Sequence, residues 1–195
     1  DNGLFEWKIL TMNLTTGESH ELLKGNIAYA FEYPRIFAEE DGKLYLVVKA
    51  NDEVQILFIE DAKINIIKSL KNEKINSFDM NTITYQDEKI YYSCSDIDNK
   101  YTVKVLDIYN GDNKSIYKST DERFAIYTFN VIEHKIIIQE IIDNGKSNLI
   151  TVNINSNIIE NTVATELLTL PEIINAESIL FHQSNNTWKV YNIIQ

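Results

Sequence analysis

The chain consists of short runs of alternating apolar and polar residues, and small polar clusters separate these runs at regular spacing. The runs are rich in Ile, Val, Tyr, Phe and Thr, which are the residue types that favour β-strands. In the middle of the chain we expect strands near 82–86, at 89–95, at 101–109 and at 114–118. One segment, 162–170, has leucines close together before a proline and is the best candidate for a helix. The pattern as a whole predicts an all-β fold.

Two markers recur along the chain at a fixed interval. One is an apolar residue, then Asp or Asn, then another apolar residue; it is centred on Asp107 and Asn153, which are 46 residues apart. The same marker is centred on Asn13 near the start of the chain and on Asn192 near its end. A fixed period in this range is typical of propellers and other repeat arrays. The other marker is a turn followed by a strand, again with copies 46 residues apart: 41–46, 87–92 and 133–138.

Each unit also carries a pair of Asn or Asp residues between its markers, and such residues favour the tight turn of a hairpin. The pairs are Asn51-Asp52, Asp98-Asn99, Asp143-Asn144 and Asn185-Asn186. A unit of this length has room for four strands, A to D in chain order, which is the size of one propeller blade. Because one four-stranded sheet cannot cover both of its own faces, the copies are expected to pack on each other.

We therefore predict a β-propeller-like array of four-stranded antiparallel blades, with three complete and two partial blade units, or four to five blades. The whole chain, 1–195, is expected to form a single domain. Its repeat units are expected at about 1–33, 34–79, 80–124, 125–171 and 172–195.

Several segments resemble the blades of TolB-type and WD-repeat-like β-propellers. They are EEDGKLYLVV and YQDEKIYYSC, each followed by an Asp or Asn turn, and then VKVLDIYNGDNKSIYK. The family's S-P-D-G-K turn is reduced here to Asp41-Gly42-Lys43, and no Trp-Asp dipeptide occurs. The resemblance covers nearly the whole chain. It implies the fold and the binding of a protein or small ligand on one face of the propeller, and it implies no reaction.

Two finer expectations follow from the repeat. The first unit lacks strands A and B and the last lacks strand D, so each would leave an unpaired strand edge. We expect the two ends to meet and to bring Trp7 near Trp188; the alternative is pairing with blades lost upstream. We also expect strand B of each unit to turn one face inward. That face carries Leu44, Leu46 and Val48, then Ile90, Tyr92 and Cys94, then Ile136 and Ile138.

Composition narrows the classes of partner. Hydrophobic residues make up 44% of the 195 residues, enough for a real core, and the formal net charge of -11 argues against nucleic acid and anionic membranes. No apolar run approaches the roughly 18 residues that a membrane span needs. Cys94 is alone, which excludes an internal disulfide and fits either an extracytoplasmic bacterial protein or a cytosolic one. Because the chain starts at Asp1 rather than Met, we expect an upstream part, such as a signal peptide, an anchor or a further domain.

The histidines and serines of the chain do not form the sequence motif of a metal site or of a nucleophilic serine. His20, His134 and His182 lie in different units without zinc-ligand spacing, so neither a metal nor a cofactor is expected. Ser93 and Ser95 stand inside a strand and lack the turn that presents a nucleophilic serine. No catalytic, cofactor-binding or metal residue is assigned, and the ligand-binding residues stay open.

Two turn sequences resemble ion-binding loops. Segment 143–147 contains Gly-Lys-Ser, but Glu140 stands where a phosphate-binding loop needs its first glycine. Segment 96–99 resembles the start of a calcium loop, but Tyr101 and Asp107 occupy the places of its glycine and glutamate. We interpret both segments as hairpin turns.

The remaining candidates have simpler interpretations. Cys94 is expected to be a buried, inert thiol. Trp7 and Trp188 are expected to belong to the core or to seal terminal blades rather than to stack on a sugar or peptide. The adjacent acids at 39–41 should point to different faces, which disfavours a glycosidase pair.

The leading hypothesis for function is a non-catalytic binding or sensing module. It would be the extracytoplasmic part of a bacterial surface protein, lipoprotein or membrane-anchored regulator, although a cytoplasmic location stays open. The alternative is a propeller enzyme that acts on a carbohydrate or peptide with its site at one mouth of the axis. A third hypothesis is a scaffold that only mediates assembly within a larger protein.

Overall fold

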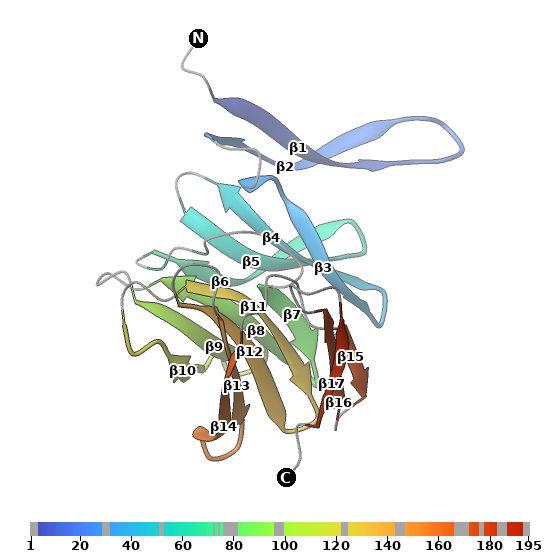
Figure 1. Ribbon diagram of the computed structural model, residues 1–195. Coiled ribbons are helices and arrows are strands. Elements are labelled where there is room, and N and C mark those ends of the chain that lie inside the picture. Colours follow the sequence, from blue (N-terminus) through green and yellow to red (C-terminus); the bar gives the residue numbers. More distant parts are fainter. Residues whose placement is uncertain are drawn as a thin grey trace.

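The computed structural model is an open array of antiparallel β-sheets (Figure 1). Within the described residues the chain forms seventeen strands in five sheets and no α-helix. The structure describes residues 4–28, 32–50, 53–71, 73, 75, 82–95, 100–121, 125–142, 147–165, 172–175, 178–182 and 187–192.

Each sheet is made of strands that are consecutive in the chain, and the five sheets follow one another in chain order. The first sheet has two strands, β1 (Phe5–Met12) and β2 (Ser19–Ile27). The second has four, β3 (Arg35–Glu40), β4 (Lys43–Ala50), β5 (Glu53–Glu60) and β6 (Lys63–Leu70). The third has β7 (Ile83–Gln86), β8 (Lys89–Ser95), β9 (Tyr101–Asp107) and β10 (Asn113–Lys118). The fourth has β11 (Ala125–Ile132), β12 (Lys135–Ile141), β13 (Ser147–Asn153) and β14 (Ile158–Thr165). The fifth has β15 (Glu172–Asn175), β16 (Ser178–His182) and β17 (Trp188–Asn192).

The predicted fold class is confirmed, with three complete four-stranded blades between two partial ones. The helix expected at 162–170 is wrong for its first part, because 162–165 belongs to β14. There the backbone of Val163 pairs with that of Leu149 on β13, so sheet pairing decides the conformation rather than the nearby leucines. Residues 166–170 lie outside the described residues.

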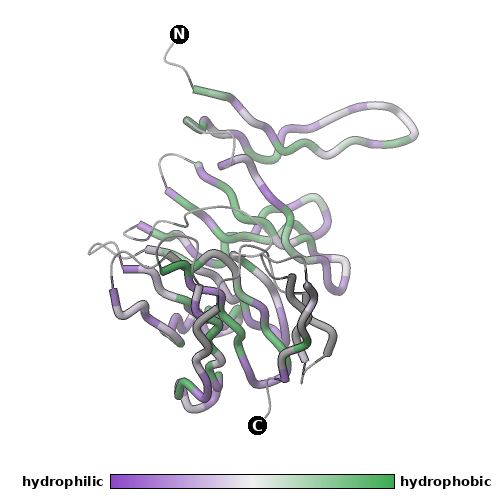
Figure 2. The backbone as a smooth tube through the Cα atoms, viewed as in Figure 1, coloured by the Kyte–Doolittle hydropathy of each residue, from purple (hydrophilic) through white to green (hydrophobic). Residues whose placement is uncertain are grey.

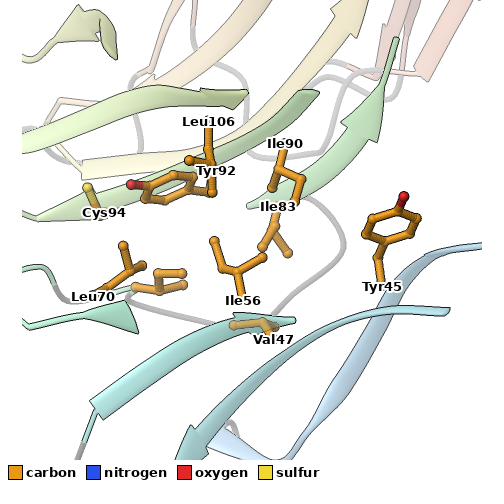
Figure 3. Packing of buried hydrophobic residues seen from close by; sticks show 10 residues of the cluster. Tyr45, Val47, Ile56, Leu70, Ile83, Ile90, Tyr92, Cys94 and Leu106 are labelled. Atoms are coloured by element: carbon orange, nitrogen blue, oxygen red, sulfur yellow. The ribbon is translucent and has the colours of Figure 1, made fainter. Parts of the chain in front are cut away.

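Each inner sheet is packed on both of its faces. Figure 3 shows the core between the second and third sheets, where Val47 and Ile56 meet Ile90 and Tyr92. Strand B is therefore buried on both faces, and the expectation of a single inward face is incomplete. The expected face is apolar and turns toward the preceding sheet in each blade, whereas its alternate residues turn toward the following sheet. The alternate residues include Tyr45 of β4, which packs in the core between the second and third sheets.

Hydrophobic segments lie along the strands of the inner sheets, where the cores form (Figure 2). A second core joins the first and second sheets through Trp7, Ile27, Leu46, Val48, Ala50 and Leu57. A third core joins the third and fourth sheets through Tyr91, Val103, Ile116, Tyr117, Ile126, Phe129, Ile136, Ile138, Ile150 and Val152. The sheets thus contact one another in series.

The Asp or Asn marker of the repeat closes the turn between strands C and D. The side-chain oxygen of Asp107 accepts the backbone N–H of Tyr109 at 3.0 Å and of Asn110 at 3.1 Å. Asn13 and Asn153 accept the N–H groups at the same two offsets. The residue four positions after each marker has a positive φ: Gly17, Gly111 and Asn157. The marker therefore encodes an Asx turn. The polar pairs expected at the turns between strands B and C lie outside the described residues.

Asp107→Asn should keep this turn, because Asn13 and Asn153 make the same contacts. The backbone N–H groups of Asn110 and Tyr109 hold the pKa of Asp107 below its usual value. A carboxylate of this kind stabilises the fold above its unfolded pKa of about 3.9, and that contribution is lost as pH falls through the lower folded pKa. Wild type should therefore lose stability relative to Asp107→Asn only in acid, as read from urea midpoints at several pH values. An unchanged difference between the two proteins at all pH values would contradict this.

The array does not close into a ring, so the expectation that its ends meet is wrong. Among the described strands β1 pairs only with β2, and β17 pairs only with β16. Figure 1 places the first hairpin and the last sheet at opposite ends of the array. Trp7 is buried against the second sheet, whereas Trp188 is exposed. The apolar face of the hairpin thus packs on β4 and β5 and is not available to the C-terminal strands.

Candidate functional site

The three histidines do not come together in one site. His20 is exposed on β2, and His134 is exposed in the turn between β11 and β12. His182 ends β16, and its side chain lies outside the description. Within the described ranges no three or more His, Cys, Asp or Glu side chains form a group that could hold a metal ion. No helix in the part of the chain that the structure describes has the length and hydropathy to cross a membrane.

Several other sequence candidates lie in ordinary positions of the sheets. Strand β8 contains three candidates, Ser93, Cys94 and Ser95, and all three are buried. Their position inside a strand was predicted. Glu39 and Glu40 are exposed at the end of β3, before a turn in which Asp41 has a positive φ. The two segments compared with ion-binding loops, 96–99 and 143–147, lie outside the described residues except for Ser147.

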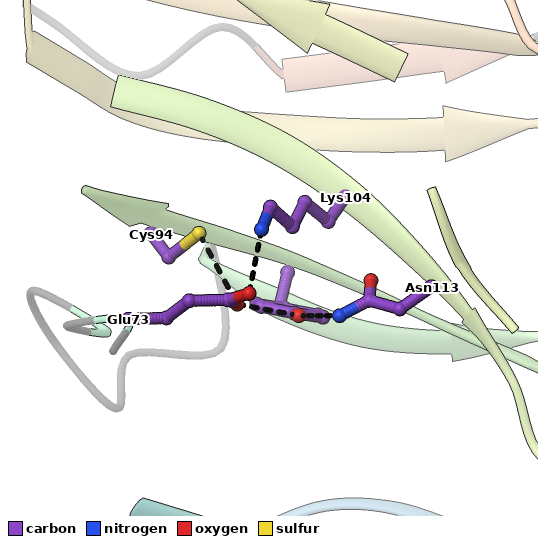
Figure 4. A network of polar contacts seen from close by, with 5 residues as sticks. Glu73, Cys94, Lys104 and Asn113 are labelled. Carbon is purple, nitrogen blue, oxygen red and sulfur yellow. Dashed lines mark hydrogen bonds and ion pairs between the residues drawn. The ribbon is translucent and has the colours of Figure 1, made fainter. Parts of the chain in front are cut away.

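A polar network that the repeat does not predict lies between the second and third sheets (Figure 4). We call it the Glu73 network, and its members are Glu73, Tyr92, Cys94, Lys104 and Asn113. The Glu73 carboxylate pairs with Lys104 Nζ at 2.6 Å and accepts the Tyr92 hydroxyl at 2.8 Å. Cys94 Sγ lies 3.7 Å from the same carboxylate, and Asn113 Nδ2 donates to the Tyr92 hydroxyl oxygen at 2.7 Å. The network therefore ties the segment after β6 to three strands of the third sheet.

The groups of the Glu73 network are mostly removed from solvent. The side chains of Glu73 and Lys104 are only 20% and 18% exposed. Burial, and then the negative charge of Glu73, raise the pKa of Tyr92, so its hydroxyl stays protonated and donates. Asn113 Oδ1 is buried and has no hydrogen-bond partner among the described residues. A paired carboxylate and a protonated phenol that face each other fix the segment after β6 to the third sheet.

Two further carboxylates are paired within the protein. Glu32, in the segment before β3, pairs with Lys49 of β4 at 2.6 Å. Glu140 of β12 is buried and accepts the hydroxyls of Tyr117, at 2.8 Å, and of Ser119. Burial and this carboxylate raise the pKa of Tyr117. These two carboxylates, like that of Glu73, are therefore engaged by donors of the protein itself.

A different arrangement occurs where the A–B and C–D turns of the second and third sheets lie together. We call it the aromatic end and define it by Glu40, Tyr45, Tyr85, Glu88 and Tyr109. The ring of Tyr85 stacks on that of Tyr45 with centroids 4.5 Å apart, and burial followed by a hydrogen bond to Glu40 raises the pKa of Tyr85. Tyr109 donates its hydroxyl to Glu88 at 2.9 Å, although the residue is 74% exposed.

Local sequence explains why Tyr109 is held in place. It is the third residue of the Asx turn that begins at Asp107, and the backbone N–H of Ile108 donates to the Glu88 carbonyl at 3.3 Å. The A–B turn and the C–D turn of the third sheet are thus bonded to each other. The sequence pattern does not predict this site, because Tyr109 lies outside the apolar positions of the repeat. The sequence feature that could have indicated it is the Asx-turn marker at Asp107.

The charge around the aromatic end is predominantly negative. Lys43 lies over the ring of Phe58 at 5.6 Å and pairs with Glu60 at 3.8 Å. Acidic residues outnumber lysines in the turns at this end of the two sheets. The acidic residues are Glu39, Glu40, Asp41, Glu60, Asp61, Asp87, Glu88, Asp107 and Asp112, and the lysines are Lys43, Lys63, Lys89 and Lys114.

Comparison with known proteins supports the fold. The sequence matches no protein-family model, and no curated protein matches it. The structure is similar to oligogalacturonate lyase from Vibrio parahaemolyticus, with a TM-score of 0.59 and 13% identity over 93% of this chain and 54% of that one. It is also similar to a chain of a nidogen/laminin complex, with a TM-score of 0.49 and 9% identity over 98% of this chain and 72% of that one.

The lyase has a propeller-type fold, in keeping with the four-stranded blades seen here. At this identity the likeness concerns the fold alone. The chain spans about half the length of the lyase chain that it matches. The finer resemblance to TolB-type and WD-repeat-like blades stays a prediction.

Proposed function

We propose that the chain is a non-catalytic binding or sensing module that takes a cationic ligand, such as an arginine-rich protein segment, at the aromatic end. The observation that carries this proposal is the ring of Tyr109, which is exposed to solvent yet held by Glu88. An aromatic ring fixed in this way loses little conformational freedom on binding. Its face attracts a guanidinium or ammonium group.

The charge distribution supports the same ligand class. Glu40 and Glu88 lie at the aromatic end, where a bound cation would be close to both carboxylates. The carboxylates of Glu73 and Glu140 are already engaged between the sheets. The net charge of -11 would also speed the encounter with a cationic partner at low ionic strength.

A titration with a short arginine-rich peptide, followed by calorimetry, tests the proposal, with a glutamate-rich peptide of equal length as the control ligand. Wild type should bind only the basic peptide, and salt should weaken the binding. Tyr109→Ala should weaken it by about tenfold, as expected for loss of a cation–π contact and its packing. Tyr33→Ala, which removes another exposed tyrosine, should leave affinity unchanged.

Two results would contradict the proposal. One is basic-peptide binding that persists in both Tyr109→Ala and Glu88→Gln, because the ligand would then lie elsewhere. The other is turnover of a carbohydrate or peptide by the purified chain, which would favour the enzyme alternative.

We further propose that the module belongs to the extracytoplasmic part of a bacterial surface protein, lipoprotein or membrane-anchored regulator. The repeat architecture and acidic surface support a role in binding outside the cell. Protease treatment of intact cells of the source organism tests this, because an extracytoplasmic chain should become accessible without lysis. Protection in intact cells and recovery with cytosolic markers would contradict it.

A further inference from the structure

The two ends of the array expose large apolar side chains on sheet faces that have no neighbouring sheet among the described strands. On the first sheet Leu10 and Met12 are 54% and 61% exposed. On the last sheet Trp188 and Val190 are 57% and 59% exposed. The inner sheets bury residues on both of their faces, and the two terminal faces of the described array differ from them in being exposed.

The repeat shows which kind of face the first sheet exposes. When the Asx turns at Asn13 and Asp107 are aligned, Met12 corresponds to Leu106, which is buried in the core shared with the preceding sheet. Trp7, on the other face of β1, packs on the second sheet. Leu10 and Met12 therefore lie on the face that meets a preceding sheet in a complete blade.

The same alignment applied at the other end gives the opposite face. Asn192 corresponds to Asn153, so Trp188 corresponds to Leu149. On β13, Ile150 packs against the third sheet, and Leu149, which is also buried, points the other way. Trp188 and Val190 therefore lie on the face that meets a following sheet.

We propose that these faces bind each other in head-to-tail association of two copies, with the last sheet of one copy packed on the first sheet of the next. The argument rests on continuity, because the described cores within the chain join these same two kinds of face. Burial of four large apolar side chains supplies the driving force, and the ion pairs of Lys8 with Glu6 and Glu21 share the face of Leu10 and Met12. The interface is heterologous, so it can extend or close into a ring. Two copies together have about the length of the propeller-type lyase chain, of which one copy spans 54%.

Both terminal sheets of the described array also have an open strand edge. β1 has no strand B beside it, and β17 has no strand D beside it, among the described strands. Exposed edges of this kind favour pairing with another chain.

Sedimentation velocity of the purified chain over a range of concentrations tests the proposal. Wild type should gain mass as concentration rises, whereas Leu10→Lys and Trp188→Lys should each remain monomeric at the same concentrations. Leu10→Lys places a lysine opposite Glu21 on β2, so the hairpin itself should tolerate it. Ile66→Lys, at another exposed apolar site on β6, should associate like wild type.

Mixing the two monomeric variants gives the sharper result. Leu10→Lys keeps an intact last sheet and Trp188→Lys keeps an intact first sheet, so an equimolar mixture should form a dimer that stops at two copies. Circular dichroism and thermal unfolding of each variant alone establish that it is folded. A wild type that is monomeric at its highest soluble concentration overturns the proposal, and would leave the faces to a further segment of a longer protein. A mixture that stays monomeric, or single variants that still associate, also overturns it.

Discussion

Replacing Lys104 by methionine should lower the free energy of unfolding by about 3 kcal/mol, the low end of the range for breaking a buried ion pair. The variant keeps a long side chain but leaves the Glu73 carboxylate without its cation at a site that is only one-fifth exposed. The hydroxyl of Tyr92 still donates to Glu73, which is why we expect the low end of the range. Urea unfolding at neutral pH measures the change.

A double-mutant cycle separates the ion pair from the packing. Lys104→Met combined with Glu73→Gln removes both charges, so it should be more stable than Lys104→Met alone. Lys8→Met is the matched control, because Lys8 pairs with Glu6 and Glu21 on the exposed face of the first hairpin. A solvent-exposed pair of this kind contributes far less to stability than a buried one. Equal losses from the two lysine substitutions would show that the Glu73 network is no stronger than a surface pair.

Trp7→Ala should cost about 3–5 kcal/mol, as is typical when a buried tryptophan is truncated. Trp7 is 5% exposed and joins the first hairpin to β4 and β5 of the second sheet. Because that hairpin contacts the array on one side only, it should detach while the inner sheets stay folded. Hydrogen exchange should therefore show loss of protection in β1 and β2, with β8 and β12 unchanged. Ile66→Ala, at an exposed apolar position of β6, should leave protection intact.

Gly25→Ala tests the same contact from the opposite strand. Gly25 lies directly across from Trp7, and an added Cβ would lie 2.7 Å from the tryptophan ring and 2.8 Å from the carbonyl oxygen of Lys49. Since one of these neighbours is backbone, the hairpin must shift, at a cost of about 1–3 kcal/mol. Unchanged exchange in both Trp7→Ala and Gly25→Ala would mean that the hairpin is held by other contacts.

Local pattern was sufficient to predict the blades. Strand B at 89–95 coincides with β8, because a short run rich in β-favouring residues and a polar turn at each end are both visible in the sequence. The order and completeness of the blades followed from counting repeat markers. Ring closure was predicted wrongly, because the docking of Trp7 over Gly25 depends on which face of a hairpin meets a neighbour.

The candidate site was harder to predict for a different reason. Glu73 lies between strands. The residues that correspond to Lys104 in other units, such as Leu10, are apolar. The contact of Glu73 with Lys104 is a property of one junction and not of the unit. Tyr109 likewise gains its place from Glu88, a residue 21 positions away that shares no local pattern with it. Side chains that depart from the repeat carry the specific chemistry here, and a repeat analysis averages them out.

The packing of each inner sheet by two different faces bears on how such a chain can change length in evolution. A duplicated unit of 46 residues, inserted between existing units, would offer each neighbour the kind of face that it already contacts. Whole units can therefore be gained or lost without a new type of interface. Insertion of a single residue within strand B would instead exchange its two faces, so Tyr91 and Tyr92 would each point into the wrong core. Selection should tolerate duplication of units far better than small insertions inside their strands.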